Sequence, residues 1–221
     1  MAAAKKLRWE RRPESRPQEL LDAALAVFAE RGYRNTRIDD VAEAAGVTKG
    51  AVYHYFATKE DLLLRAIEHY HERAFGEIGD MLRGAGGSVS TRIRLMMRKA
   101  FGASRDGRRM TLAVILQGVR HDLPEAHQKW LLGGPVAGWR LLAALIEEGK
   151  SAGEFRADVD AEVAARVVIS GLITQMIWQP IAVDLPELLI DEDRLLDSTV
   201  ETLLHGLWPA VVVPTAVRAA S

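Results

Sequence analysis

A short segment in the first third of the chain carries side chains suited to holding a polyanion. Lys49 and Tyr53 lie four residues apart, so on a helix a cation and a phenol share one face. Gly50 has no side chain and lets the backbone of that face approach a partner closely. Val52 and Phe56, also four apart, form an apolar face that packs inward. A helix with these two faces is suited to a nucleic-acid duplex.

The chemistry expected of these residues is non-covalent. Lys49 falls in the first turn of its helix, where its ammonium group can reach a phosphate or the edge of a guanine. Lys59, Thr36 and Arg37 stand at the starts of two other expected helices, whose positive ends favour a phosphate. The residues predicted to contact double-stranded DNA are Thr36, Arg37, Thr48, Lys49, Gly50, Tyr53, His54, Tyr55 and Lys59.

Short helices on either side of a tight turn must position these groups. Gly46 can adopt the left-handed conformation that ends a helix, and Thr48 can cap the next helix with its hydroxyl. Thr36 is expected to cap the preceding helix, with Asp39 returning a capping hydrogen bond and Asp40 also favouring the positive helix start. Two helices joined in this way form a helix-turn-helix, whose second helix fits the major groove of DNA.

This segment resembles the TetR-type one-component transcriptional regulators. The resemblance is detailed over the first quarter of the chain; beyond that it rests on helical layout and on the segment 153–156, Gly-Glu-Phe-Arg. It implies that Tyr53 bonds a phosphate and so positions the protein rather than specifying sequence. The matching residues are Thr36, Ile38, Val41, Ala42, Ala45, Gly46, Val47, Thr48, Gly50, Val52, Tyr53, Tyr55, Phe56, Lys59 and Leu62.

We expect an all-α fold, with an N-terminal three-helix helix-turn-helix domain and a C-terminal helical domain for ligand binding and dimerisation. Helices are predicted at about 17–31, 36–45, 49–56, 59–83, 90–104, 109–120, 123–150, 160–179 and 192–208. The triplet Gly133-Gly134-Pro135 should kink or break the seventh of these. The predicted parts are a basic arm (1–16), the DNA-binding domain (17–60), the ligand-binding and dimerisation domain (61–210) and a flexible tail (211–221).

Two of these segments have distinct roles in this scheme. The arm carries six cations against two carboxylates, so it either follows the DNA backbone or is a solvated terminus without a role. The long helix at 59–83 is either a lever between the two domains or a plain connection.

The last two helices are expected to pair with their copies in a second subunit. Each has apolar residues on more than one side, so each must be covered on more than one side. In the resemblance the four helices form a bundle, and a two-fold dimer suits a palindromic site; the alternative is the core of a monomer. The predicted interface residues are Val167, Ser170, Gly171, Thr174, Leu196, Val200, Leu203 and Leu207.

The middle helices offer a hypothesis for a ligand site. Large aromatic and sulfur-containing side chains with a few polar groups describe a pocket, although they also describe an ordinary core. Acidic residues are scarce among the apolar positions, so we expect a neutral or anionic hydrophobic molecule. The candidate residues are Met97, Phe101, Gln117, His121, Trp130, Trp139, Gln175, Met176 and Trp178.

Composition limits the other classes of protein. The chain has 221 residues, a formal net charge of −1 and no cysteine, so neither disulfides nor thiolate chemistry are available. We find no signal-peptide pattern and no long apolar run, and expect a cytoplasmic protein without a membrane partner. No cofactor and no enzymatic activity are expected. The alternatives are a DNA-binding scaffold without an inducer, or a helical metal-dependent enzyme that uses His121 and Glu125, with His127 nearby.

Overall fold

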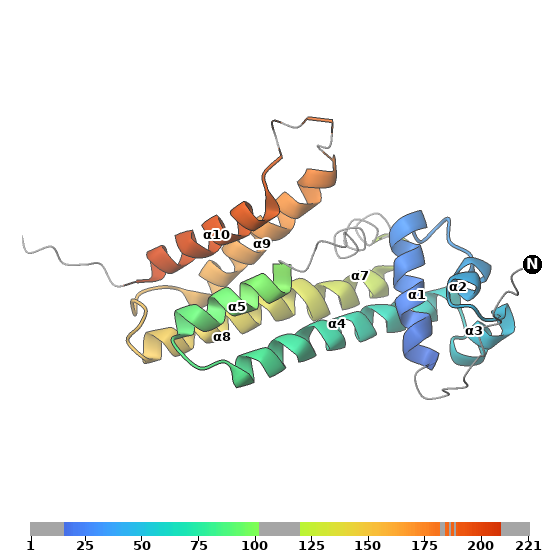
Figure 1. The fold of residues 1–221 in the computed structure, drawn as a ribbon, viewed down its shortest axis with the longest axis horizontal. Coiled ribbons are helices and arrows are strands. Elements are labelled where there is room, and N and C mark those ends of the chain that lie inside the picture. The colour runs from blue at the N-terminus through green and yellow to red at the C-terminus, as the bar shows by residue number, and fades with distance from the viewer. Residues whose placement is uncertain (1–15, 102–119, 182–183, 186, 188, 209–221) are drawn as a thin grey trace, which may run out of the picture. The chain divides into compact units, whose positions relative to one another are not determined.

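The structure, a computed structural model, describes residues 16–101, 120–181, 184–185, 187 and 189–208 (Figure 1). The regular structure of these ranges is helical, which confirms the predicted all-α fold. The predicted helix at 109–120 lies outside them except for its last residue, as do nearly all of the arm and the whole tail. The elements are α1 (Arg16–Arg31), α2 (Ile38–Ala44), α3 (Lys49–Tyr55), α4 (Lys59–Gly84), α5 (Val89–Phe101), α7 (Pro124–Leu131), a π-helical turn (Leu132–Val136), α8 (Ala137–Ser151), α9 (Ala161–Ile181) and α10 (Glu192–Leu207).

The chain divides into two compact units, and the division falls inside α4. The first unit contains the chain up to Glu72 and also α7 as far as Trp130. The second unit contains the rest of α4 from Arg73 and the chain from Leu131 onward. The expected boundary after Glu60 lies too early, because the first turns of α4 supply the core of the first unit. Its buried residues are Leu20, Leu21, Ala24, Val27, Phe28, Ile38, Val41, Ala42, Val52, Phe56, Leu62, Leu63, Ala66, Ile67, Leu123 and Ala126.

Helix α7 belongs to the DNA-binding half of the chain, which the sequence pattern did not indicate. Leu123 and Ala126 are buried in that core. The guanidinium of Arg34 bonds the carboxylate of Asp122, with Nε 3.1 Å from Oδ2. Residues 88 positions apart in the sequence therefore meet within the first unit.

The second unit packs α5, α8, α9 and α10 around its own core. Helix α8 lies against α5 and α9, and α10 lies against α5 and α9. None of the helices in the described part of the chain is long and apolar enough to cross a membrane. The buried residues of this core are Ile78, Val89, Ile93, Met96, Met97, Leu142, Leu145, Ile146, Phe155, Ala161, Ala165, Ile169, Leu172, Leu196, Val200, Leu203, Leu204 and Leu207.

The Gly-Glu-Phe-Arg segment, which follows α8, is hydrogen-bonded to the start of α5. Gly153 ends α8 with φ of +74°, a conformation that favours glycine. The next residue, Glu154, accepts hydrogen bonds from the backbone N–H groups of Val89 (2.7 Å) and Ser90 (2.8 Å), and from the Ser90 hydroxyl. One carboxylate thereby satisfies two N–H groups at the start of α5 that have no partner within the helix.

We predict that Glu154→Gln lowers the free energy of unfolding by about 1–3 kcal/mol at pH 7, because a charged acceptor is lost. Burial raises the pKa of this carboxyl, but hydrogen bonds from Ser90 and Val89 outweigh burial and hold it below the ordinary 4.5. Since the folded-state pKa is depressed, the stabilisation is present above pH 4.5 and disappears as pH falls through the folded-state value.

Urea denaturation between pH 3 and pH 7 measures this effect. The gap between wild type and Glu154→Gln should close at low pH. Glu147→Gln is the matched control, because the Glu147 side chain makes a surface ion pair with Lys150 at 2.8 Å and no other polar contact among the described residues. A gap of the same size at every pH would contradict the assignment.

The Gly-Gly-Pro triplet changes the helical geometry without ending the helical segment. Residues Leu132–Val136 form one π-helical turn between α7 and α8, with Pro135 inside it. A wider turn accommodates the proline, which lacks an N–H and would clash with an α-helical turn. The N–H of Ala137 then bonds the carbonyl of Gly134. The predicted interruption therefore takes the form of a π bulge.

Candidate nucleic-acid interface

The turn between α2 and α3 has the geometry expected from its residues. Gly46 has φ of +65°, which reverses the chain after α2. The N–H of Val47 bonds the carbonyl of Ala42 at 2.9 Å. Thr48 caps α3, because its hydroxyl oxygen accepts a hydrogen bond from the N–H of Ala51 at 3.3 Å. The predicted roles of Gly46 and Thr48 are confirmed.

Helix α3 has one buried and one exposed face, as predicted. Val52 is fully buried and Phe56, which follows the helix, is 3% exposed. Tyr53, on the other side of the helix, is 47% exposed. We call the exposed set the α3 surface; its members are Thr48, Lys49, Gly50, Tyr53, His54 and Tyr55.

Gly50 leaves the backbone of the α3 surface exposed. Among the described residues, a Cβ added there would find only the Thr48 hydroxyl, at 3.9 Å. Packing within this part of the chain therefore does not require the glycine. A glycine at this position lets a binding partner approach the backbone of α3 closely.

The start of α2 differs from the prediction by one residue. The capping residue is Arg37, whose N–H donates to Asp40 Oδ2 at 2.7 Å. Thr36 is 1% exposed, and its hydroxyl donates to the carbonyl of Gly32 at 2.8 Å. The predictions that Thr36 caps α2 and that its side chain contacts DNA are therefore corrected, because the hydroxyl closes the end of α1. Arg37 is exposed.

Lys59 is tied into the domain rather than extended towards solvent. Its Nζ donates to the carbonyls of Tyr33 (2.8 Å) and Thr36 (2.9 Å). It also lies 4.2 Å from the centroid of the Tyr33 ring. Burial lowers the pKa of the amine. Two of its three N–H groups hold the loop between α1 and α2, so a phosphate contact remains a prediction for the third.

We predict that Lys59→Met lowers the free energy of unfolding by about 1.5–3 kcal/mol, because charge-assisted hydrogen bonds to two carbonyls are lost. Lys49→Met is the matched control, since the Lys49 side chain is about half exposed and should cost under about 0.5 kcal/mol. Thermal and urea melts measure both. Equal melting of the two variants would show that the loop does not depend on Lys59.

Lys49 pairs with a carboxylate from the neighbouring helix. Its Nζ lies 2.7 Å from Oδ2 of Asp39, and both side chains remain about half exposed. The hydrogen bond to Asp39, followed by the charge of Asp39, raises the pKa of Lys49. The capping bond expected of Asp39 is made by Asp40 instead. The α3 surface therefore presents a lysine that is already held in place.

Comparison with known proteins decides the family of this helix-turn-helix. The family model for bacterial regulatory proteins of the tetR family matches residues 20–66. The HTH-type transcriptional repressor KstR2 of Rhodococcus jostii is 30% identical over 151 residues, covering 68% of this chain and 73% of that protein. The chain belongs to the TetR family. It is therefore a DNA-binding transcriptional regulator, and regulators of this family respond to ligands.

Two further relatives of this TetR-family regulator extend the similarity. The transcriptional regulator AcuR of Cereibacter sphaeroides is 35% identical over 152 residues, covering 67% of this chain and 68% of that protein. The structure of the fatty acid degradation regulator FadR from Bacillus halodurans matches with a TM-score of 0.71 at 25% identity, covering 86% of this chain and 98% of that chain. The likeness therefore extends beyond the helix-turn-helix.

The structure separates the candidate ligand residues of this TetR-family regulator. Met97 is buried in the core of the second unit, and Phe101 and Trp139 pack against that core. Trp130 instead packs in the first unit, its ring centroid 4.9 Å from that of His71. Gln117 and the side chain of Met176 lie outside the described residues, while His121, Gln175 and Trp178 are exposed.

These positions do not form one described pocket. The aromatic residues were grouped by type, whereas the fold assigns Trp130 and Trp139 to different cores. The guanidinium of Arg166 covers the Trp139 ring at 4.7 Å. Over the described ranges, no cluster of three or more His, Asp or Glu side chains is placed to hold a metal.

The predicted dimer interface divides between two environments. Val167 is 66% exposed, and Ser170, Gly171 and Thr174 are exposed on the same helix, α9. The α10 members lie in the chain's own core, between 2% and 8% exposed, so they have almost no area to bury against a partner. Their assignment to the interface is corrected; they are Leu196, Val200, Leu203 and Leu207.

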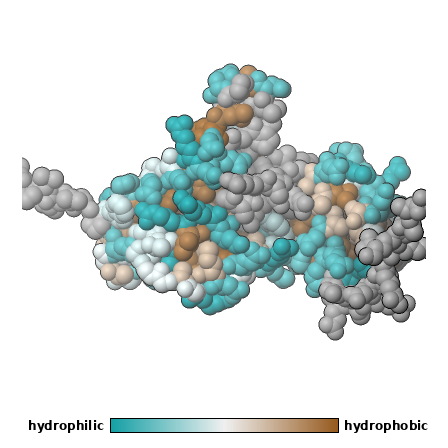
Figure 2. Space-filling model, in the orientation of Figure 1, coloured by the Kyte–Doolittle hydropathy of each residue, from teal (hydrophilic) through white to brown (hydrophobic). Residues whose placement is uncertain are grey.

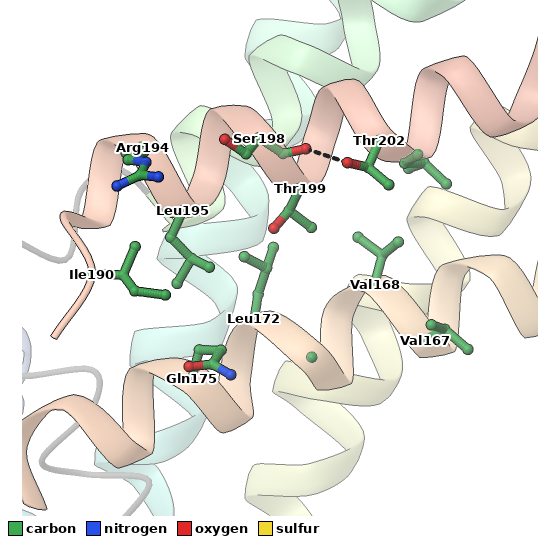
Figure 3. A pocket seen from close by; sticks show the side chains of 12 residues that line it. Val167, Val168, Leu172, Gln175, Ile190, Arg194, Leu195, Ser198, Thr199 and Thr202 are labelled. Carbon is green, nitrogen blue, oxygen red and sulfur yellow. Dashed lines mark hydrogen bonds between the residues drawn. The ribbon is translucent and has the colours of Figure 1, made fainter. Parts of the chain in front are cut away.

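A groove of about 560 Å³ runs between α9 and α10 (Figure 3). Val167, Gly171 and Gln175 line it from α9, and Ser198 and Thr202 from α10. The Thr202 hydroxyl donates to the carbonyl of Ser198 at 2.7 Å. Figure 2 shows hydrophobic surface near the end of this unit where α9 ends and α10 begins. The side of α10 that borders the groove is mixed, because Leu195 lines it together with Ser198, Thr199 and Thr202.

Proposed function

We propose that this regulator is a repressor that binds a palindromic operator as a homodimer and is released by a hydrophobic small molecule. The observation that carries the proposal is the α3 surface, exposed along one side while Val52 and Phe56 hold the helix in the core. A helix held in this way enters the major groove as a rigid element. The repressor KstR2, with 30% identity, supports the direction of regulation.

Each residue of the α3 surface has a proposed role. Lys49 reaches a base edge or a phosphate from the first turn of α3. Gly50 lets the helix backbone lie close to the groove. Tyr53 donates its hydroxyl to a phosphate, which sets register without reading sequence. Arg37, exposed at the start of α2, adds a phosphate contact.

The homodimer is proposed to form through α9. This helix has exposed apolar side chains, Val163, Val167 and Trp178, opposite those that pack in the core. The exposed Gly171 lets another helix approach closely. A two-fold pair presents two copies of α3, and such copies read half-sites one helical turn apart, about 34–36 Å.

We predict that Val167→Asp shifts the protein from dimer to monomer, because an unpaired carboxylate would be buried in an apolar contact. Sedimentation velocity measures the change, and operator binding should weaken with it. Leu95→Asp is the control, since Leu95 is 37% exposed on α5, away from the groove. A Val167→Asp variant that sediments as the wild type would place the dimer contact elsewhere.

Release is proposed to follow from differential affinity of a ligand for two conformers. A ligand shifts the equilibrium only if it binds more tightly to the conformer whose two α3 helices are wrongly spaced. The similarity to a fatty acid degradation regulator supports a hydrophobic ligand. Such a ligand would be neutral or anionic, because acidic residues are scarce among the apolar positions of the second unit.

An unbiased selection from random duplex DNA, made with and without candidate ligands, tests the function. The expected result is a palindromic motif whose recovery falls when a hydrophobic acid or thioester is added. A motif that no ligand weakens would favour a scaffold without an inducer. Recovery of no motif would refute sequence-specific binding.

A further inference from the structure

We propose that Asp39 is a positioning residue that sets the DNA sequence preference by holding the side chain of Lys49. The proposal rests on the proposed function, in which α3 reads the major groove. It adds a residue of α2 to the reading surface. It also gives a carboxylate a role at a surface whose partner is a polyanion.

The two helices bring Asp39 and Lys49 together from opposite sides of the turn. Asp39 is the second residue of α2 and Lys49 is the first residue of α3. Their side chains meet with Oδ2 2.7 Å from Nζ, which is the distance of a charge-assisted hydrogen bond. A lysine side chain has many rotamers, and this bond selects among them.

Asp39 is available for this contact because its neighbour does the capping. Asp40 accepts from the N–H of Arg37 and also pairs with Arg31 at 2.6 Å. Asp39 makes neither bond and is exposed. The adjacent carboxylates in the first turn of α2 thus have different partners. Asp40 caps the helix, and Asp39 pairs with Lys49 of α3.

Stability does not account for the pair. The side chains of Lys49 and Asp39 are 51% and 59% exposed, and an ion pair so exposed contributes little to folding. Against DNA the consequences are larger. The ammonium donates one of its three N–H groups to Asp39. The bond restricts the directions of the remaining two, which can donate to a guanine edge.

The carboxylate also limits binding to DNA of any sequence. Lys49 and the nearby Arg37 would together present two positive charges, of which Asp39 cancels one. Neutralising one phosphate fewer lowers the salt slope by about 0.9. Non-specific affinity falls, while a site that offers the right base edge to the oriented lysine keeps its contact. The ratio between the two affinities is the specificity.

Asp39→Asn in the full-length protein tests the proposal, with the motif selected by the wild type as probe. We expect affinity for random duplex at 0.1 M salt to rise about five- to tenfold, and the salt slope to steepen by about 0.9. The selected motif should lose information at the base pair that Lys49 contacts. Asp39→Glu, which keeps the charge, should restore most of the preference.

Two comparisons separate orientation from simple removal of charge. Glu43→Gln removes a carboxylate one turn further along α2, where no polar side-chain contact is found among the described residues. It should leave the motif unchanged. In a Lys49→Ala background, Asp39→Asn should no longer alter the motif, because the side chain that Asp39 holds is gone.

The outcomes distinguish the possible failures. If Asp39→Asn leaves the motif as it is, or acts equally with and without Lys49, the positioning role is overturned while the proposed function stands. If the wild type selects no motif at all, the proposed function fails first. Circular dichroism melts close to that of the wild type confirm that the variants compared are folded.

Discussion

Gly50→Leu is expected to leave this regulator folded and to lower its operator affinity about 100-fold, equivalent to about 2.7 kcal/mol. The part of the chain that the structure describes has room for the side chain, since its nearest atom to an added Cβ is the Thr48 hydroxyl at 3.9 Å. Leucine also favours a helix more than glycine does, so stability should rise by about 0.5–1 kcal/mol. The DNA has no such room, because the branched side chain would stand between α3 and the groove. Stability and binding therefore move in opposite directions.

Fluorescence anisotropy with the selected operator and a thermal melt measure the two quantities on one sample. Gly76→Leu is the matched control, because Gly76 is an exposed helical glycine of α4 and the described ranges place no atom within 4 Å of its added Cβ. It should gain stability and keep operator affinity. Retained affinity in Gly50→Leu would remove α3 from the interface, and lost stability would mean that the glycine serves the fold.

Gly149→Ala is expected to cost about 3 kcal/mol of unfolding free energy, although alanine usually stabilises a helix. An added Cβ would lie 2.1 Å and 2.3 Å from two carbons of the Phe155 ring. Phe155 is 3% exposed and belongs to the core of the second unit. The turn after α8 brings the ring back onto that helix, where only a glycine leaves space for it. Close packing of the interior leaves the ring few places to move.

Urea denaturation compares this variant with Gly138→Ala. Gly138 also lies in α8, but no atom of the described residues is within 4 Å of its added Cβ. That variant should gain about 0.5–1 kcal/mol. Phe155→Leu in the Gly149→Ala background should recover part of the loss, because a smaller side chain relieves the overlap. Two alanine variants of equal stability would refute the close approach.

Local patterns were sufficient where the chain interacts with its near neighbours. Gly46 and Thr48 act within a few residues of themselves, so their roles in the turn followed from residue type. The two faces of α3 followed from the spacing of Val52, Phe56 and Tyr53. The family resemblance was detailed in the same segment, and it was shown by the comparisons.

Other assignments depended on backbone carbonyls that residue types do not reveal. Thr36 suits a helix cap, but the carbonyl of Gly32 takes its hydroxyl, which moves the cap to Arg37. Lys59 suits a phosphate site, but the carbonyls of Tyr33 and Thr36 hold its ammonium group. Backbone carbonyls have no signature in a sequence, so these acceptors could not be anticipated.

The sequence alone determined the helix-turn-helix, the all-α fold and which side of α3 faces outward, because helical periodicity and capping act over a few residues. Only the tertiary structure decided which apolar stripes were interior. The stripe of α10 is covered by its own chain, whereas Val167 on α9 remains exposed. Amphipathic patterns state that a face must be buried but not by what. The same limit applied to Asp39, whose partner Lys49 was identified only once α2 and α3 were packed together.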